Sequence, residues 1–175
     1  MRLGGFNNML LELAVMFLFP AVMVFAGVLD LFTMKISNRI SIGLIAGFVC
    51  LVPFAGFGWE TIALHFVTGA VMLVLGIGAF AAGWIGGGDA KLFAAASLWM
   101  GHEYIYEYAL VSSILGGVLT LALLAIRRFP LPAGLAEQAW IARLHDAGQG
   151  VPYGVALAIA VLIVYPHTSW VEGLV

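Results

Sequence analysis

The sequence predicts an all-α membrane protein, a polytopic bundle of about six transmembrane helices with both termini outside the cytoplasm. Of its 175 residues, 63% are hydrophobic and only 9% are charged, and the mean hydropathy is +1.10. A soluble domain of this size cannot bury so much apolar surface, whereas a bilayer can cover it. We therefore expect a single membrane-embedded domain over residues 1–175.

The predicted spans are the apolar runs between polar connections. They lie at about 9–29, 40–57, 61–84, 89–100, 104–126 and 152–165. The first run continues to Leu29 without a clear cleavage site, so we expect a retained span and not a secretory signal. The fourth run is about 12 residues long, which gives about 18 Å of helix and is too short to cross alone. Either its helix begins further back, through the preceding glycines, or the glycine turn lies inside the membrane plane against a wet cavity.

Basic residues predict the orientation of the bundle. Two connections, about 30–41 and 127–150, are expected on the cytoplasmic side, because six spans place six of the seven basic residues there. These are Lys35, Arg39, Lys91, Arg127, Arg128 and Arg143, and only Arg2 falls on the opposite side. The same topology brings Asp30, at the end of the first span, to the membrane level of Asp89, at the start of the fourth.

Composition also limits the chemistry that the chain can carry. The formal net charge is −2, so no nucleic-acid partner is expected. A single cysteine, Cys50, excludes an internal disulfide and a cysteine-based zinc site. The four histidines show no metal-ligand spacing, so we expect no metal and no cofactor.

The stretch Gly86-Gly87-Gly88-Asp89-Ala90-Lys91 is the most polar and most flexible part of the middle of the chain. An ionisable group near membrane depth is a functional candidate, and consecutive glycines allow close backbone approach. Asp89 paired with Asp30 could share one proton, so that one carboxylate activates water while the other carboxyl donates to a carbonyl oxygen. Each aspartate also has a structural explanation, since Asp89 can cap a helix and Asp30 lies at a membrane border.

These motifs resemble a known family. Gly86-Gly87-Gly88-Asp89 fits the GxGD motif of membrane aspartyl peptidases, and its extension through Lys91 resembles the type IV prepilin peptidase family in particular. In that family an aspartate ends the first span and an Ile-Pro-Asn-like element follows. Here the element reads Ile36-Ser37-Asn38, with serine in place of proline. Val151-Pro152-Tyr153-Gly154 resembles the segment that opens the last span of the family.

The resemblance implies a membrane aspartic endopeptidase with Asp30 and Asp89 as its catalytic pair. It would remove the leader peptide of type IV or Flp-type prepilins at the cytoplasmic face of the bacterial inner membrane. The short first connection and the single cysteine leave no room for the zinc element and methyltransferase activity of larger members, and the size resembles the small tight-adherence (Flp) pilus branch. Residues expected to bind substrate or shape the site are Gly86, Gly87, Gly88, Lys91, Asn38, Tyr153 and Gly154.

Other readings of the same residues stay open. A proton-coupled carrier or a pilus-assembly subunit could use the two aspartates without catalysis, although the sequence shows no inverted repeat. Another GxGD peptidase with a different membrane substrate would share the chemistry. The expected partners are the prepilin substrate and the lipid bilayer. Association with pilus assembly machinery or with further copies of the chain is left open by the sequence.

Overall fold

The computed structural model describes residues 5–172, and the side chains of residues 12–171; Arg2 lies outside this part. All regular structure in the described residues is helical, which confirms the predicted all-α class. The longer helices are α1 (Gly5–Thr33), α2 (Asn38–Leu51), α3 (Trp59–Ala81), α4 (Gly87–Ile126) and α7 (Tyr153–Val164). The short elements are η1 (Val52–Phe54), α5 (Ala133–Ala136), α6 (Ala139–His145), η2 (Tyr165–His167) and α8 (Ser169–Glu172).

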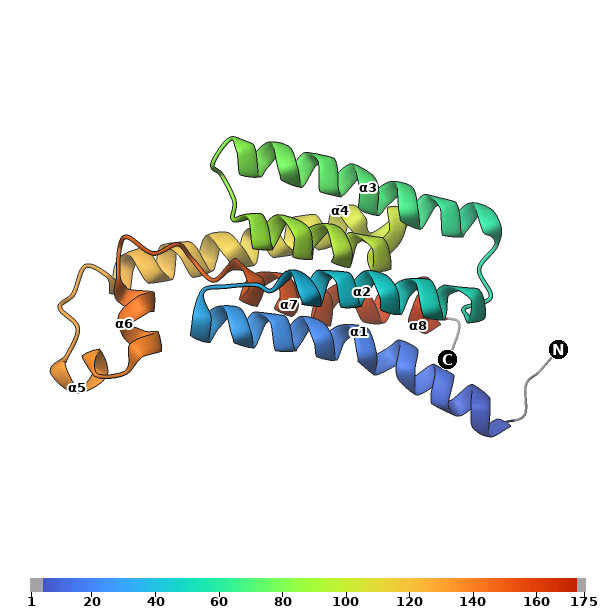
Figure 1. The fold of residues 1–175 in the computed structure, drawn as a ribbon, viewed down its shortest axis with the longest axis horizontal. Helices are drawn as coiled ribbons and strands as arrows, with labels where there is room; N and C mark the ends of the chain where they lie inside the picture. The colour runs from blue at the N-terminus through green and yellow to red at the C-terminus, as the bar shows by residue number, and fades with distance from the viewer. Residues whose placement is uncertain (1–4, 173–175) are drawn as a thin grey trace.

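Helix α4 consists of two arms that meet at Gly101. This residue has φ 68° and ψ −176°, a backbone conformation outside the helical range that is essentially reserved for glycine. Figure 1 shows the first arm running away from the loop after α3 and the second arm returning beside α7. The two arms correspond to the fourth and fifth predicted spans. The first arm begins at Gly87, so the helix does start further back than Asp89, through two of the three glycines.

The helices have the length and surface of a membrane bundle. α1, α3 and α4 are long and apolar enough to cross a membrane, and α2 with η1 and α7 with η2 form shorter apolar rods. Large apolar side chains point outward, including Phe17 (59% exposed), Val74 (69%) and Leu121 (69%). Such a surface is stable against lipid but not against water, so the chain is a membrane protein.

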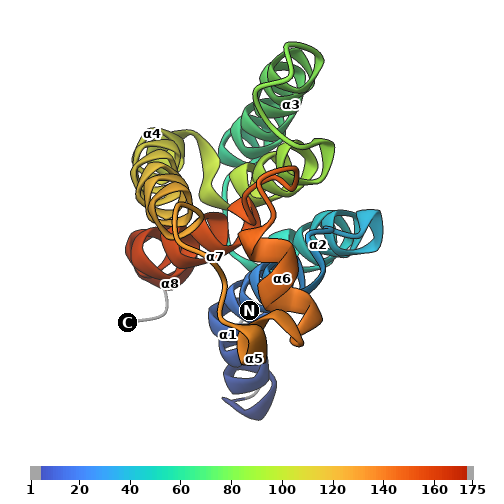
Figure 2. The ribbon, with the colours of Figure 1, turned by 90° about the vertical axis from the view of Figure 1, so that its left-hand side faces the viewer.

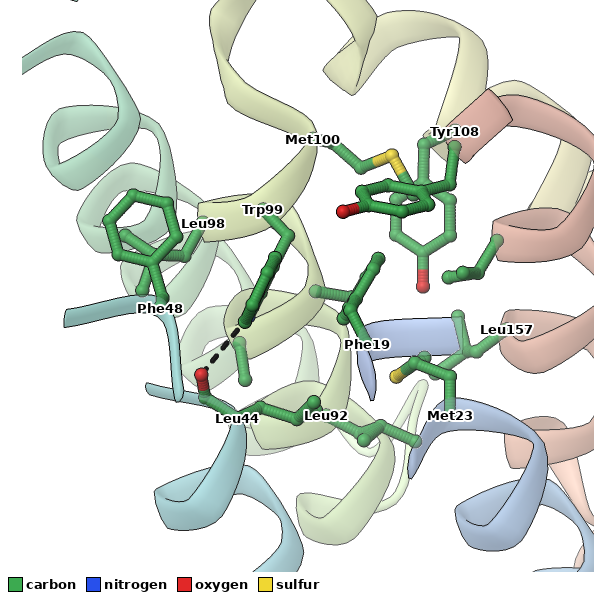
Figure 3. Packing of buried hydrophobic residues seen from close by; sticks show 14 of the residues in the cluster. Phe19, Met23, Leu44, Phe48, Leu92, Leu98, Trp99, Met100, Tyr108 and Leu157 are labelled. Carbon is green, nitrogen blue, oxygen red and sulfur yellow. Dashed lines mark hydrogen bonds between the residues drawn. The ribbon is translucent and has the colours of Figure 1, made fainter. Parts of the chain in front are cut away.

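The buried core is centred on Trp99 in the first arm of α4. Its indole stacks on Phe19 of α1 with ring centroids 4.8 Å apart, and its Nε1 donates to the carbonyl oxygen of Leu44 in α2 at 3.0 Å (Figure 3). Trp170 of α8 donates in turn to the Trp99 carbonyl at 2.9 Å. One side chain thus joins α1, α2, α4 and α8, and every buried indole N–H among them has a partner.

The connection between α1 and α2 is only residues 34–37, shorter than the expected 30–41. Helix α1 continues through Asp30 because residues 30–33 contain no glycine or proline, and it ends at Met34, which takes a left-handed φ of 54°. The Met34 amide donates to the carbonyl oxygen of Asp30 at 2.7 Å. Asp30 therefore lies inside the helix, one turn before its end, and its side chain direction is set by α1.

The second long connection, within residues 127–152, folds back on the bundle. It contains two short helices, α5 and α6. Trp140 packs edge-on against Phe32 at 5.1 Å, and Arg143 donates to the Phe32 carbonyl oxygen at 2.6 Å. The guanidinium of Arg127 binds the carbonyl oxygens of Leu144 and Gly150. These contacts hold the connection at the end of the bundle where α1 ends and α4 begins (Figures 1 and 2).

Candidate active site

Asp30 lies in a close contact between α1 and α7. Its side chain is buried, with 4% of the residue exposed. The amide of Gly154 donates to its Oδ2 at 2.8 Å. The helices meet closely because Gly27, one turn before Asp30, faces α7: a β-carbon there would lie 2.9 Å from the Cβ of Ala158. Small residues at the helix contact therefore bring a backbone donor directly to the buried carboxylate.

Asp89 lies in the first turn of α4, after the N-cap residue Gly86. Its carboxylate folds back and is hydrogen-bonded by the backbone of Gly86. This contact requires glycine, because a β-carbon on Gly86 would lie 2.7 Å from the Asp89 Oδ2. Asp89 is therefore not the N-cap residue that it could have been; it is an acidic residue of the first turn whose carboxylate binds the backbone of the N-cap residue Gly86. The side chain also borders a cavity of about 160 Å³ that Ser112, Ser113 and Tyr153 help to line.

The two aspartates meet at one end of the bundle. The amide of Gly154 binds Asp30, and the neighbouring residue Tyr153 lines the cavity that Asp89 borders, so the two carboxyls lie in one neighbourhood. Ile36 lies between Gly88 of α4 and Gly154 of α7: a β-carbon on Gly88 would be 3.1 Å from the Ile36 Cβ, and one on Gly154 would be 3.1 Å from the Ile36 Cδ1. The α1–α2 connection thus fills the space between the α4 and α7 segments that carry or contact the two carboxyls.

Tyr153 forms a further wall of the site. Its ring lies on Gly116 of the second arm of α4, where even a methyl group would overlap the ring. Its hydroxyl hydrogen-bonds the Ser113 side chain, and the charge of Asp89 acts on it. The phenol therefore lines the same cavity that Asp89 borders.

The remaining residues expected at the site lie elsewhere. Lys91 donates to the Oδ1 of Asn38 at 3.0 Å, and both side chains are exposed. Two residues advance a helix by about 200°, so Lys91 leaves α4 on a different face from Asp89. Gly87 packs against the ring of Phe80 in α3. These three residues shape the neighbourhood of α4 but do not face the cavity beside Asp89.

Sequence reasoning did not single out Ile36, Ser113 or Gly116 as site residues. Gly116 lies at four-residue spacing from Ser112 and Thr120. This small-residue pattern indicates helix packing in general and does not mark a functional site. Ile36 opens the Ile36-Ser37-Asn38 element, in which serine stands where the family motif has proline. The motifs mark the region of each residue, but they do not specify its contact partner. The contacts of Gly116 with Tyr153 and of Ile36 with Gly154 are set by the tertiary fold.

The site offers carboxylate chemistry without an obvious metal position. Among the described residues, no group of three or more His, Cys, Asp or Glu side chains could hold a metal ion. The reactive groups gathered at this end are two carboxyls, a phenol and serine hydroxyls. Two carboxyls close together can share a proton and work as base and acid on one substrate.

The chain was compared with family models, curated proteins and solved structures. A family model described as the type IV leader peptidase family matches residues 17–121, more than half of the chain. The chain belongs to this family. Membership confirms the resemblance read from the motifs and supports a leader-peptidase-like protease. The matched segment contains Asp30 and Asp89, while Tyr153 and Gly154 lie beyond it. No curated protein and no solved structure gives a significant match.

Proposed function

We propose that this leader peptidase family member is a membrane aspartic endopeptidase that removes the leader peptide of type IV or Flp-type prepilins. The observation that carries the proposal is the arrangement of Asp30 and Asp89. They come from helices far apart in sequence and lie at one end of the bundle, where Gly154 binds Asp30 and the adjacent Tyr153 lines the cavity beside Asp89. Family membership supports the peptidase class, and the two carboxyls supply the equipment of the aspartic type.

In the proposed reaction one carboxyl is ionised and the other protonated. The ionised carboxylate takes a proton from water, and the water oxygen bonds to the carbonyl carbon of the scissile peptide. The protonated carboxyl gives its proton to the carbonyl oxygen, which yields a neutral tetrahedral diol. Collapse of the diol breaks the C–N bond as the amine nitrogen takes a proton from the first carboxyl and the diol returns one to the second. No covalent enzyme intermediate forms.

The surroundings suggest different tasks for the two aspartates. Asp30 is buried and accepts the Gly154 amide, a contact that fixes the direction of its carboxyl. Asp89 borders the cavity of about 160 Å³, where water or the peptide carbonyl can reach it. We infer that Asp30 is the fixed partner and that Asp89 meets the substrate first. Tyr153 and Ser113 would then hydrogen-bond the peptide backbone on the far side of the cavity.

The site is proposed to face the cytoplasm. The end of the bundle that bears the aspartates also carries Lys35, Lys91 and, because the second arm of α4 returns to it, Arg127, and the α6 connection adds Arg143. An excess of basic residues marks the cytoplasmic side of membrane proteins. A leader peptide at the start of a prepilin would enter there, in the inner membrane of a bacterium.

Methyl transfer is not part of the proposal. The α1–α2 connection spans four residues, 34–37, and holds no cysteine, while the single cysteine of the chain, Cys50, is exposed on α2. This restricts the proposed activity to peptide cleavage and favours the small Flp branch.

The test is cleavage of a purified prepilin by the purified full chain, with the new N-terminus mapped by mass spectrometry. Asp30→Asn and Asp89→Asn preserve size and should each lower the cleavage rate by about 10²- to 10⁴-fold or more, the usual contribution of general acid–base catalysis. Glu60→Gln is the matched control, because it removes an exposed carboxylate at the opposite end of the bundle and should keep full activity. Wild-type processing by either aspartate variant refutes the proposal. So does proton or solute flux in proteoliposomes together with full cleavage by both variants, which favours a carrier.

A further inference from the structure

A second cavity lies between α2 and α3, with the first arm of α4 as its floor. Its volume is about 520 Å³. Side chains from all three helices line it, namely Ile42, Ile45, Phe66, Leu73, Ala95 and Leu98. We call it the α2/α3 groove. The groove forms because α3 packs closely on α4, with Gly69 against Leu98, while α2 stands apart from α3 (Figure 2).

One end of the α2/α3 groove is polar. Lys91 and Asn38 close it, joined by the 3.0 Å hydrogen bond from Nζ to Oδ1. Lys91 keeps two of its three N–H donors, and Asn38 keeps its amide N–H₂, because only the amide oxygen is engaged. Asn38 is also the first residue of α2, where the helix dipole is positive. The unused hydrogen-bonding capacity of this end is therefore mostly that of donors beside a positive charge, which is complementary to an anion.

Just inside this end lies a polar group without a protein partner. Ser41 is 6% exposed, lines the groove, and its hydroxyl makes no hydrogen bond in the structure. A buried donor without an acceptor is unfavourable, so such groups are normally satisfied by water or a ligand. Ser41 lies about one helical turn along α2 from Asn38, at the polar end of the groove. Its hydroxyl can therefore donate to an acceptor atom of a ligand whose anionic group binds Lys91 and Asn38.

The size of the groove decides between the two apolar occupants that a membrane offers. An α-helix is about 10 to 12 Å across, so a single turn fills about 400 to 600 Å³. The groove therefore holds no more than about one turn of a protein helix. A hydrocarbon chain is thinner and can lie along the whole length of the groove. The apolar lining with a few polar groups at one end is also typical of sites for amphiphilic small molecules.

We propose that the α2/α3 groove binds an anionic phospholipid from the cytoplasmic leaflet. The phosphate lies at Lys91 and Asn38, an ester carbonyl accepts from Ser41, and one acyl chain runs along the apolar lining. Basic pockets between transmembrane helices on the cytoplasmic side are established places for anionic headgroups. The lipid would fasten the start of α4, two residues after Asp89, to the start of α2, two residues after Ile36. This makes it a structural ligand of the helix ends that carry the catalytic site.

The test measures lipid retention by native mass spectrometry on the delipidated full chain, with phosphatidylglycerol and phosphatidylcholine of the same acyl chains as probes. The wild type should keep one phosphatidylglycerol per chain and prefer it to phosphatidylcholine. Lys91→Gln should weaken phosphatidylglycerol retention by about fivefold, the usual effect of one basic residue at a membrane surface. Ala70→Phe should abolish retention, because Ala70 lines the groove and is exposed to it.

Matched controls separate the site from general surface effects. Arg128→Gln removes an exposed charge at the same end of the bundle, and Val74→Phe enlarges a lipid-facing α3 side chain outside the groove. Both should retain the lipid. Ser41→Ala should weaken retention without lowering the melting temperature of the lipid-free protein, because its hydroxyl contacts no protein acceptor.

Three results overturn the proposal. Equal retention of both lipids, or an unchanged value for Lys91→Gln, shows that no anion site exists. Loss of lipid-free stability in Ser41→Ala shows that the hydroxyl has a protein partner. The groove is a substrate site, and not a lipid site, if prepilin releases phosphatidylglycerol from the wild type and the Ala70→Phe variant no longer cleaves prepilin. The lipid-retention and stability outcomes do not depend on whether Asp30 and Asp89 are the catalytic pair, and only the outcome with prepilin rests on the proposed function.

Discussion

Gly154→Ala should disable the site while changing a single methyl group. The new β-carbon would lie 2.9 Å from the Oδ2 of Asp30, 3.0 Å from its Cβ and 3.1 Å from the Cδ1 of Ile36. These separations are shorter than ordinary van der Waals contact, and neither neighbour is the free end of a long flexible side chain. Either the Asp30 carboxyl moves away or α7 moves away from α1. In both cases the 2.8 Å hydrogen bond from the Gly154 amide is lost or weakened.

Two opposing effects set the change in stability. Replacing glycine by alanine inside a helix is worth about 0.5 to 1 kcal/mol when nothing is in the way. Overpacking of a buried contact costs about 1 to 3 kcal/mol, and a lost hydrogen bond to a charged group costs about 1.5 to 3 kcal/mol. We expect a net loss of about 2 kcal/mol or more in the free energy of unfolding. A displacement of about 1 Å at a catalytic group lowers the rate by about 10²-fold.

The assay is prepilin cleavage by mass spectrometry together with thermal unfolding in detergent. Gly117→Ala is the matched control, because it makes the same substitution in α4 at a position with nothing within 4 Å. It should keep full activity and gain slightly in stability. If Gly154→Ala cleaves prepilin as fast as Gly117→Ala, the contact between α7 and Asp30 plays no part in the reaction.

Three further substitutions test the helix contacts that hold the site. Gly116→Ala would overlap the ring of Tyr153, so it should lower the cleavage rate at least about tenfold and cost about 1 to 3 kcal/mol of stability; an unchanged rate would remove the phenol from the site. Gly101→Ala places a β-carbon 2.6 Å from the His65 ring and puts alanine at φ 68°, so it should lower the melting temperature for two reasons. Adding His65→Ala removes the steric contact but leaves the backbone strain of about 1 to 3 kcal/mol, so the double variant should regain only part of the lost melting temperature. Full restoration would mean that the contact alone matters. Trp99→Phe removes the indole donor to α2 and should cost about 1 to 3 kcal/mol of stability, with cleavage retained at low temperature; no change in melting temperature would contradict its central place in the core.

Much of the fold could be predicted because membrane helices obey a simple length and composition rule. The runs around Phe19, Val74 and Leu121 are apolar for long enough to specify helices on their own. The pairing of Asp30 with Asp89 followed from counting spans, since helices that end on one side must bring their ends together. Gly27 could likewise be expected to permit close packing near Asp30, and its contact with α7 confirms this.

Other features depend on contacts that no local pattern encodes. The continuation of α1 beyond Asp30 is decided by a left-handed conformation at Met34, a residue type that gives no warning of it. Ile36 contacts both Gly88 and Gly154 only because α4 and α7 both approach the α1–α2 connection. The α2/α3 groove depends on how far α2 stands from α3, which the sequence of neither helix specifies. Lys91 and Asn38 thus proved to bind each other at that groove.

The central claim is that Asp30 and Asp89 act as one catalytic unit. It is tested most directly by the cleavage rates of Asp30→Asn, Asp89→Asn and the double variant on the same prepilin. Residues that act as a unit are strongly non-additive, so each single variant should lose nearly as much activity as the double variant. The account is contradicted if either single variant cleaves at the wild-type rate, or if the two losses multiply as they would for independent sites.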